Sequence, residues 1–322
     1  MPAGEIKFDL FSGISKDLRR PDKTKAVLLH GLDHKGKDMG ILARDLAPLY
    51  DCVVIGDYDW RHAFDRLSGS LAKFLEHSTG GRSVDLIGHS YGGLVARHYV
   101  ETVRPGRAAR VRNAVLLNTP NHGCALFNFM RASPLIEYPS RFLSRGLKSF
   151  RLLVLDDRDR SIKSLTELGR AENQLDELNR RPRNPVVTYW VIATERDWWR
   201  VGGKNWELPA GDSAKVFHLL LTPPHSNAFT KVGRSMIAPE AFGHSDVLHR
   251  PWATGFTPIV KRITSRNAPA LFASVNGSRV VHINDACRVL RKAEDAVVSR
   301  LTPGLTVHKV CATCTALEAR PA

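Results

Sequence analysis

The sequence predicts an α/β protein with a mostly parallel central sheet, flanked by helices and carrying a helical insertion. Short apolar runs alternate with helical patterns through the first third of the chain, as is typical of parallel strands connected by helices. The 322 residues are 43% hydrophobic and 25% charged, which indicates a folded globular protein with a sizeable core.

The expected strands are the short apolar runs at residues 26–30, 52–55, 84–88, 111–118, 186–193 and 215–221. Two segments between them, 65–77 and 91–103, carry apolar residues at helical spacing. Near the end of the chain, residues 284–301 are amphipathic and predict one helix that begins at an Asn284 or Asp285 N-cap.

The alternation breaks down between residues 124 and 185. This stretch consists of Arg-rich amphipathic fragments and is too long for an ordinary connection between neighbouring strands, so we predict an inserted cap or lid. We therefore divide the chain into a core domain at 1–266, with the insertion at 124–185, and a C-terminal extension at 267–322 whose role the sequence does not indicate.

The chain is strongly basic, with 47 Lys and Arg against 32 Asp and Glu and a net charge of +15. Such a charge favours anionic partners. Because the excess is spread along the chain, we expect a generally basic surface and no dedicated nucleic-acid site. Peripheral contact with an anionic membrane surface is a further alternative.

The five cysteines have no disulfide-framework spacing, and their odd number indicates a reducing compartment. The N-terminal residues are interrupted by acids and glycine, and nowhere do about 18 apolar residues run together. These features predict a cytoplasmic protein. His308, Cys311 and Cys314 form an HxxCxxC pattern, but three ligands are one fewer than a structural zinc site normally takes, so we expect no metal.

The most specific motif is GHSYGG at residues 88–93, between a predicted strand and a predicted helix. A G-x-S-x-G sequence in this context is typical of a nucleophile elbow, in which a strained turn lifts the serine hydroxyl into a pocket. Gly88 and Gly92 leave room for the turn. The helix N-terminus favours the negative charge that develops on Ser90 during attack. The alternative is a Gly-rich turn without chemistry.

An elbow of this kind needs an oxyanion hole. HGL at residues 30–32 ends the first strongly apolar strand, where the chain should pass beside the elbow. We assign the two donors to the backbone N–H groups of Leu32 and Tyr91, each contributing roughly 3–4 kcal/mol of transition-state stabilisation. The alternative for His30-Gly31 is a plain turn at the end of a strand.

These motifs resemble the lipase and esterase branch of the α/β-hydrolases, near the lecithin-cholesterol acyltransferases and GPI-inositol deacylases. The resemblance covers residues 25–265 and rests on VLLHGL, LIGHSYGGLVARHYVE, LLNTPNHG, LTELGRAENQLDELNRRP before VVTYWVIATERDW, and GHSDVLHRP. It implies an α/β-hydrolase fold. The chain departs from the family after Thr-Pro, because Asn121 stands where a histidine is usual and His122 follows.

The resemblance implies a Ser-His-Asp triad in the chain order serine, acid, histidine. His244 in the GHSD segment fits the general base better than His218, His225 or His249. Two residues compete for the acid. Asp212 lies in LPAGDSAKV, which is similar to the family's Gly-Asp-Gly-x-Val turn, and Asp197 directly follows a predicted strand. We rank Asp212 first.

The expected function is hydrolysis of carboxylic esters through an acyl-enzyme on Ser90, without metal or organic cofactor. An ester or a lipid-like small molecule is the expected substrate. Acyl transfer or thioester hydrolysis would use the same residues, and a catalytically silent binding protein is a further alternative. The apolar residues of the insertion either line an acyl pocket or form the insertion's own core; they include Phe127, Phe129, Met130, Leu135, Ile136 and Phe142.

Overall fold

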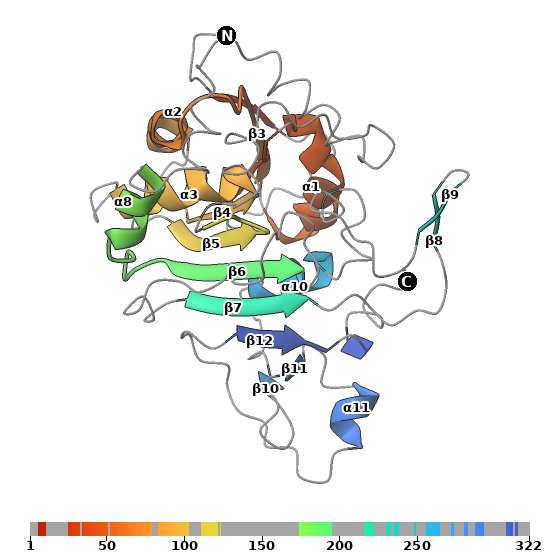
Figure 1. The fold of residues 1–322 in the computed structure, drawn as a ribbon. Helices are drawn as coiled ribbons and strands as arrows, with labels where there is room; N and C mark the ends of the chain where they lie inside the picture. The colour runs from red at the N-terminus through yellow and green to blue at the C-terminus, as the bar shows by residue number, and fades with distance from the viewer. Residues whose placement is uncertain are drawn as a thin grey trace, which may run out of the picture.

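The computed structural model gives the fold of the chain (Figure 1). It describes residues 6–10, 25–32, 34–50, 52–78, 83–102, 111–121, 123, 174–194, 216–221, 230–232, 235–237, 248, 256–264, 272–273, 280–282, 287–292, 307–311 and 313–314.

A ten-stranded sheet forms the centre of the described structure, in the order β1-β3-β2-β4-β5-β6-β7-β12-β11-β10 (Figure 1). Neighbouring strands pair in parallel, except that β1 is antiparallel to β3 and β10 is antiparallel to β11. The strands are β1 (Ile6–Leu10), β2 (Lys25–Leu29), β3 (Cys52–Tyr58), β4 (Val84–His89), β5 (Val111–Leu117), β6 (Thr188–Thr194), β7 (Val216–Leu221), β10 (Phe272–Ala273), β11 (Val280–His282) and β12 (Val307–Val310). A separate hairpin joins β8 (Thr230–Val232) to β9 (Ser235–Ile237).

Helices cover both faces of the sheet. One face carries α2 (Phe64–Ser78), α3 (Tyr91–Thr102) and α8 (Gln174–Arg180). The other carries α1 (Gly40–Leu46) and α10 (Phe256–Thr264). The shorter helices are η2 (Gly36–Met39), η3 (Ala47–Leu49) and α11 (Arg288–Arg291).

Burial on both faces explains the continuous apolar runs of the central strands. In β2, Val27 and Leu29 pack into the core with α2 and α3, whereas Ala26 and Leu28 pack into the core with α1 and α10. Side chains of a strand alternate between the two faces, so a strand covered on both sides is apolar at most positions of both faces. All six residues of β4 are buried for this reason.

The predicted α/β fold is confirmed, and each of the six apolar runs is a strand within one to three residues of its expected bounds. Most of the predicted insertion lies outside the described residues. Its last part, α8, packs on the same sheet face as α2 and α3. None of the helices in the described ranges combines the length and the apolar character that crossing a bilayer needs.

The C-terminal segment extends the same sheet. β12 pairs with β7, β11 pairs with β12, and β10 pairs with β11, so strands from both sides of residue 266 lie in one sheet. The helix predicted over 284–301 is wrong at its start, because Cys287 is not helical and α11 begins at Arg288.

Candidate active site

Ser90 lies on the turn between β4 and α3, with φ at 53°. This is the left-handed region, which a residue with a side chain seldom adopts. Two backbone hydrogen bonds hold the turn: Ser90 N–H donates to the Leu117 carbonyl of β5 at 2.8 Å, and Gly93 N–H donates to the Ser90 carbonyl at 3.0 Å. The serine is therefore fixed by the sheet on one side and by the helix on the other.

Glycines let α3 approach the sheet closely enough to form this turn. A Cβ on Gly88 would lie 2.5 Å from the backbone of Gly92 and Gly93, and a Cβ on Gly93 would collide with the Thr119 side chain. Only residues without a side chain fit at these two positions. The N-terminus of the twelve-residue α3 thus lies directly against the ends of β4 and β5, where its dipole favours negative charge beside Ser90.

The turn after β2 passes beside the same serine. A Cβ on Gly31 would lie 2.6 Å from the Cβ of Ser90, so the His30–Leu32 segment and the elbow are in contact. Leu32 follows in this turn. Tyr91 is the residue directly after Ser90 and the first residue of α3. The structure thus brings Ser90, Leu32 and Tyr91 to one place.

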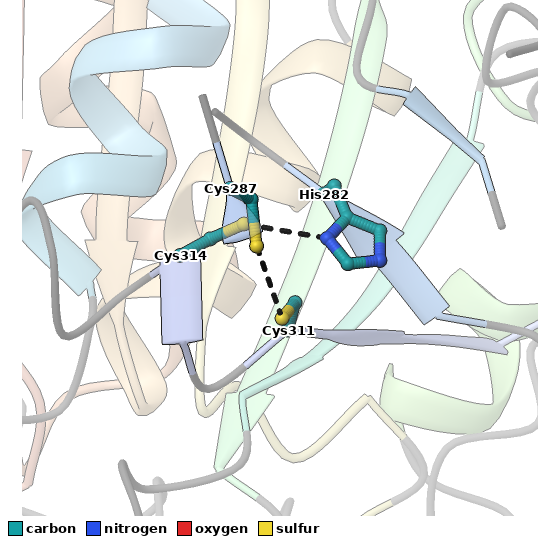
Figure 2. A group of neighbouring side chains, drawn as sticks. All are labelled: His282, Cys287, Cys311 and Cys314. Carbon is teal, nitrogen blue, oxygen red and sulfur yellow. Dashed lines mark hydrogen bonds between the residues drawn. The ribbon is translucent and has the colours of Figure 1, made fainter. Parts of the chain in front are cut away.

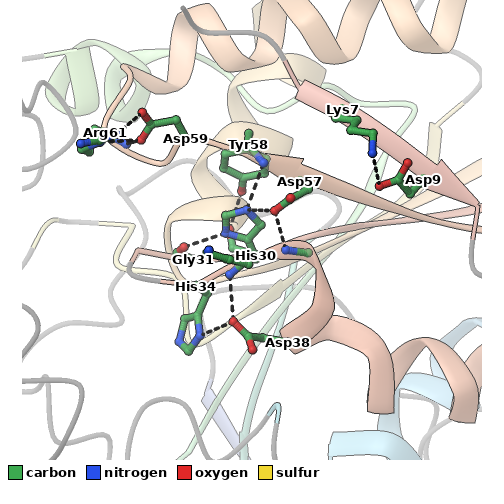
Figure 3. A network of polar contacts seen from close by, with 12 residues as sticks. Lys7, Asp9, His30, Gly31, His34, Asp38, Asp57, Tyr58, Asp59 and Arg61 are labelled. Carbon is green, nitrogen blue, oxygen red and sulfur yellow. Dashed lines mark hydrogen bonds and ion pairs between the residues drawn. The ribbon is translucent and has the colours of Figure 1, made fainter. Parts of the chain in front are cut away.

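His30 is fully buried and holds this turn in position (Figure 3). Its Nδ1 is 2.9 Å from the Gly31 carbonyl, and Tyr58 N–H donates to its Nε2 at 3.3 Å. The two rings stack with centroids 4.0 Å apart, and the Tyr58 hydroxyl donates to the His30 carbonyl. Burial lowers the pKa of His30. The neutral ring with its proton on Nδ1 satisfies both contacts, so His30 shapes the turn.

Two aspartates fix the chain beyond that turn (Figure 3). Gly36 N–H donates to Asp57 Oδ1 at 2.7 Å, and Lys35 N–H donates to Asp38 Oδ2 at 2.8 Å. Asp57 Oδ1 is also 3.6 Å from His30 Nε2. These carboxylates tie the segment after Leu32 to β3 and to the start of η2. Sequence reasoning missed both aspartates, because charged residues at such spacings also occur on exposed loops.

Asn121, which stands where the family usually has a histidine, anchors the loop after β5. The fully buried Arg97 of α3 donates to Asn121 Oδ1 at 3.2 Å, and Asn179 Nδ2 of α8 donates to its carbonyl at 2.9 Å. Arg97 Nε also donates to Glu101 at 3.0 Å. Asn121 therefore joins α3 and α8, with its side-chain oxygen and its backbone carbonyl as the two acceptors.

The other predicted triad residues, His244, Asp212 and Asp197, lie outside the described residues, as does His122. Their positions along the chain can still be related to described strands. Asp197 comes three residues after the end of β6, and so follows the carboxyl end of a strand, as Ser90 does. Asp212 comes four residues before the start of β7, and so precedes the amino end of a strand.

The model of the alpha/beta hydrolase family matches residues 26–303, which is most of the chain. The protein belongs to this family. A comparison with curated protein sequences finds no match.

Solved structures show the same fold at low sequence identity. The esterase RhEst1 from Rhodococcus sp. is 19% identical with a TM-score of 0.50, over 81% of this chain and 94% of that one. Lipase B from Aspergillus fumigatus is 14% identical with a TM-score of 0.54, over 81% of this chain and 57% of that one. The α/β-hydrolase fold places the carboxyl ends of its parallel strands, and hence Ser90, at the edge where its members bind ligands.

Proposed function

We propose that this α/β-hydrolase cleaves carboxylic esters, with Ser90 as the nucleophile. The observation that carries the proposal is the strained φ of 53° at Ser90, held between β4 and α3 and pressed against Gly31. Strain of 1–3 kcal/mol at one residue persists only where the surroundings enforce it, and it clusters at active sites. The family match supports a hydrolase, and the structural neighbours include esterases and lipases.

In the proposed mechanism, His244 takes the proton of the Ser90 hydroxyl as its oxygen attacks the ester carbonyl carbon. The backbone N–H groups of Leu32 and Tyr91 donate to the oxyanion of the tetrahedral intermediate. Its collapse releases the alcohol, which receives the proton from His244, and leaves an acyl-enzyme. Water activated by His244 then attacks the acyl-enzyme and releases the carboxylic acid.

An aspartate orients His244 and stabilises its imidazolium form. Strand topology gives weight to Asp197, which the sequence ranked second. β6 and β4 run parallel in the sheet, so their carboxyl ends lie at one edge, and Asp197 is three residues beyond the end of β6. Asp212 is four residues before the start of β7, and the amino end of β7 lies at the opposite edge of the sheet.

The nucleophile is tested with nitrophenyl esters of increasing chain length, on the wild type and on Ser90→Ala. We expect the variant to lose roughly 10⁶-fold in turnover. Ser83→Ala, at an exposed position just before β4, is the matched control and should keep wild-type activity. Mass spectrometry of the fluorophosphonate-labelled wild type should find the label on the peptide that contains Ser90. Equal activity of wild type and Ser90→Ala would refute the assignment.

The remaining triad residues are separated by paired substitutions. Asp197→Asn and Asp212→Asn should give one severe loss, of about 10⁴-fold, and one mild loss. His244→Ala should be severe and His225→Ala mild. A severe loss in His225→Ala with an active His244→Ala would move the base to the segment that follows β7. If no ester is cleaved and no fluorophosphonate is bound, the protein is a silent member of its family.

A further inference from the structure

Four metal-ligating side chains meet in the C-terminal part of the sheet (Figure 2). They are His282, Cys287, Cys311 and Cys314, and their ligand atoms all lie within 4.8 Å of one another. Each is buried, with exposed fractions of 2%, 0%, 8% and 0%. We propose that these four residues bind a zinc ion that holds the C-terminal strands together.

Strand register brings the ligands together. β11 and β12 are parallel neighbours in which Val281 lies opposite Val310, so the residues that follow, His282 and Cys311, lie side by side at the carboxyl ends of the strands. Cys311 N–H donates to the Val281 carbonyl at 2.9 Å and fixes this pairing. Cys314 comes three residues after Cys311, and residues 313–314 are helical.

The distances fit tetrahedral zinc. With Zn–S near 2.3 Å and Zn–N near 2.0 Å, tetrahedral geometry sets ligand atoms about 3.8 Å apart for two sulfurs and about 3.5 Å apart for sulfur and nitrogen. Here the Sγ atoms of Cys287 and Cys311 are 4.0 Å apart, and Cys314 Sγ is 3.5 Å from His282 Nδ1. All other pairs of ligand atoms are within 4.8 Å, so side-chain shifts of about 1 Å or less bring the four ligands around one ion.

A disulfide is the main alternative, and it accounts for less. A bond between Cys287 and Cys311 would need their sulfurs about 2.05 Å apart, half the observed separation. It would also leave Cys314 and His282 in contact without a role. A zinc ion uses all four side chains at once.

The ligand count, which argued against a metal from sequence alone, is different in the structure. His308 lies on β12 and is not among the clustered residues, whereas His282 and Cys287 supply the third and fourth ligands. The signal in the sequence is a pair of short spacings, His282-x₄-Cys287 and Cys311-x₂-Cys314, separated by 23 residues. Two such pairs are the usual form of a structural zinc site.

The role of the proposed zinc ion follows from its coordination number and from its position in the sheet. Four protein ligands close a tetrahedral site and leave no position for water or substrate, so the ion is structural. β12 and β11 lie four and five strands from β4 in the sheet, which separates the ion from Ser90 by about 20 Å at the usual strand spacing. The proposal is therefore independent of the ester-hydrolase function.

The test is elemental analysis and X-ray absorption on the full chain, produced without an affinity tag in zinc-supplemented medium and dialysed against metal-free buffer. We expect about one zinc per chain, bound by three sulfurs at about 2.3 Å and one nitrogen at about 2.0 Å. Cys287→Ser and Cys314→Ser should each lower the zinc content at least tenfold. His308→Ala and Cys52→Ser are the matched controls and should keep it.

A ligand variant that fails to fold does not block the test, because the wild type itself can be stripped by a chelator. Zinc removal should lower the Tm, and stoichiometric zinc should restore it. Cobalt added in place of zinc should give the intense visible bands of tetrahedral thiolate coordination. Wild-type protein that contains no zinc and whose Tm is unaffected by chelator would overturn the proposal. So would a Cys287–Cys311 disulfide found by mass spectrometry of the unreduced protein.

Discussion

Gly92→Ala tests whether close packing of α3 against β2 sets the position of Ser90. A Cβ at this position would lie 2.7 Å from the carbonyl carbon of Leu29 and even closer to the carbonyl oxygens of Leu29 and His30. Carbon atoms in contact are normally about 3.5 Å apart. The start of α3 must therefore move away from β2 by about 0.8 Å, and no rotamer change can relieve the contact, because both partners are backbone.

This displacement should cost both stability and rate. Overpacking costs typically 1–3 kcal/mol, and a backbone collision belongs at the upper end, which corresponds to a fall of about 4 °C in Tm for a chain of this length. Because Ser90 and the Tyr91 amide move with α3, a shift approaching 1 Å should lower kcat/KM for a nitrophenyl ester about 10²-fold.

Gly69→Ala is the matched control, made with the same substitution in α2. Nothing lies within 4 Å of a Cβ at Gly69, which is exposed in the interior of a helix. Alanine there should raise stability by about 0.5–1 kcal/mol and leave activity unchanged. Wild-type Tm and wild-type kcat/KM in Gly92→Ala would refute the argument that this contact positions the serine.

Two further predictions concern buried polar groups. Asp85→Asn should lower the free energy of unfolding in urea by about 3 kcal/mol, because it removes the buried carboxylate paired with Arg112. Asp9→Asn, in an exposed pair with Lys7, should change it by less than about 0.5 kcal/mol, and equal losses would contradict this difference. Burial lowers the pKa of His98 to about 4 in the folded protein. The imidazole therefore binds a proton more tightly in the unfolded chain, and the free energy of unfolding should fall by about 2 kcal/mol from pH 7 to pH 5. His98→Gln should remove that part of the pH dependence, and identical profiles would contradict it.

The central strands could be predicted because their burial requires apolar residues that are close together in the sequence. β2, β4 and β5 are covered by helices on both faces, so each contains a short run of consecutive apolar residues, which in β4 and β5 follows a polar residue, Asp85 or Asn113. The elbow could be predicted for a similar reason. Gly88, Ser90 and Gly92 carry its geometry within a few residues, and no distant contact is needed to recognise it.

The outer strands could not be predicted in the same way. β1 is an edge strand in which exposed Lys7 and Asp9 alternate with less exposed residues, so it lacks an apolar run. β10, β11 and β12 have two, three and four residues, and strands this short carry little periodicity. The helix expected from residue 284 fitted an amphipathic pattern. In the structure Cys287 instead meets Cys311, a contact between segments 24 residues apart that no local pattern contains.

The proposed triad illustrates the same limit. Ser90 follows from a local motif, but the acid and the base proposed for it come from distant segments of the sequence, which only the order of strands in the sheet can relate to Ser90. Our proposal favours Asp197 over Asp212 on a topological ground, because one follows the carboxyl end of β6 and the other precedes the amino end of β7. A sequence alone does not state which strands run side by side.

The C-terminal strands also determine which strand forms the edge of the sheet. β7 pairs with β6 on one side and with β12 on the other, over the four residues of β12. Without β12, the outer side of β7 would offer unpaired N–H and C=O groups to another chain. β12 and β11 have four and three residues and so offer few backbone hydrogen bonds, and the proposed zinc ligands lie at their carboxyl ends, with His282 as the last residue of β11 and Cys311 directly after β12. Loss of the ion should therefore expose β7 and promote aggregation while the elbow, which belongs to β4, keeps its geometry.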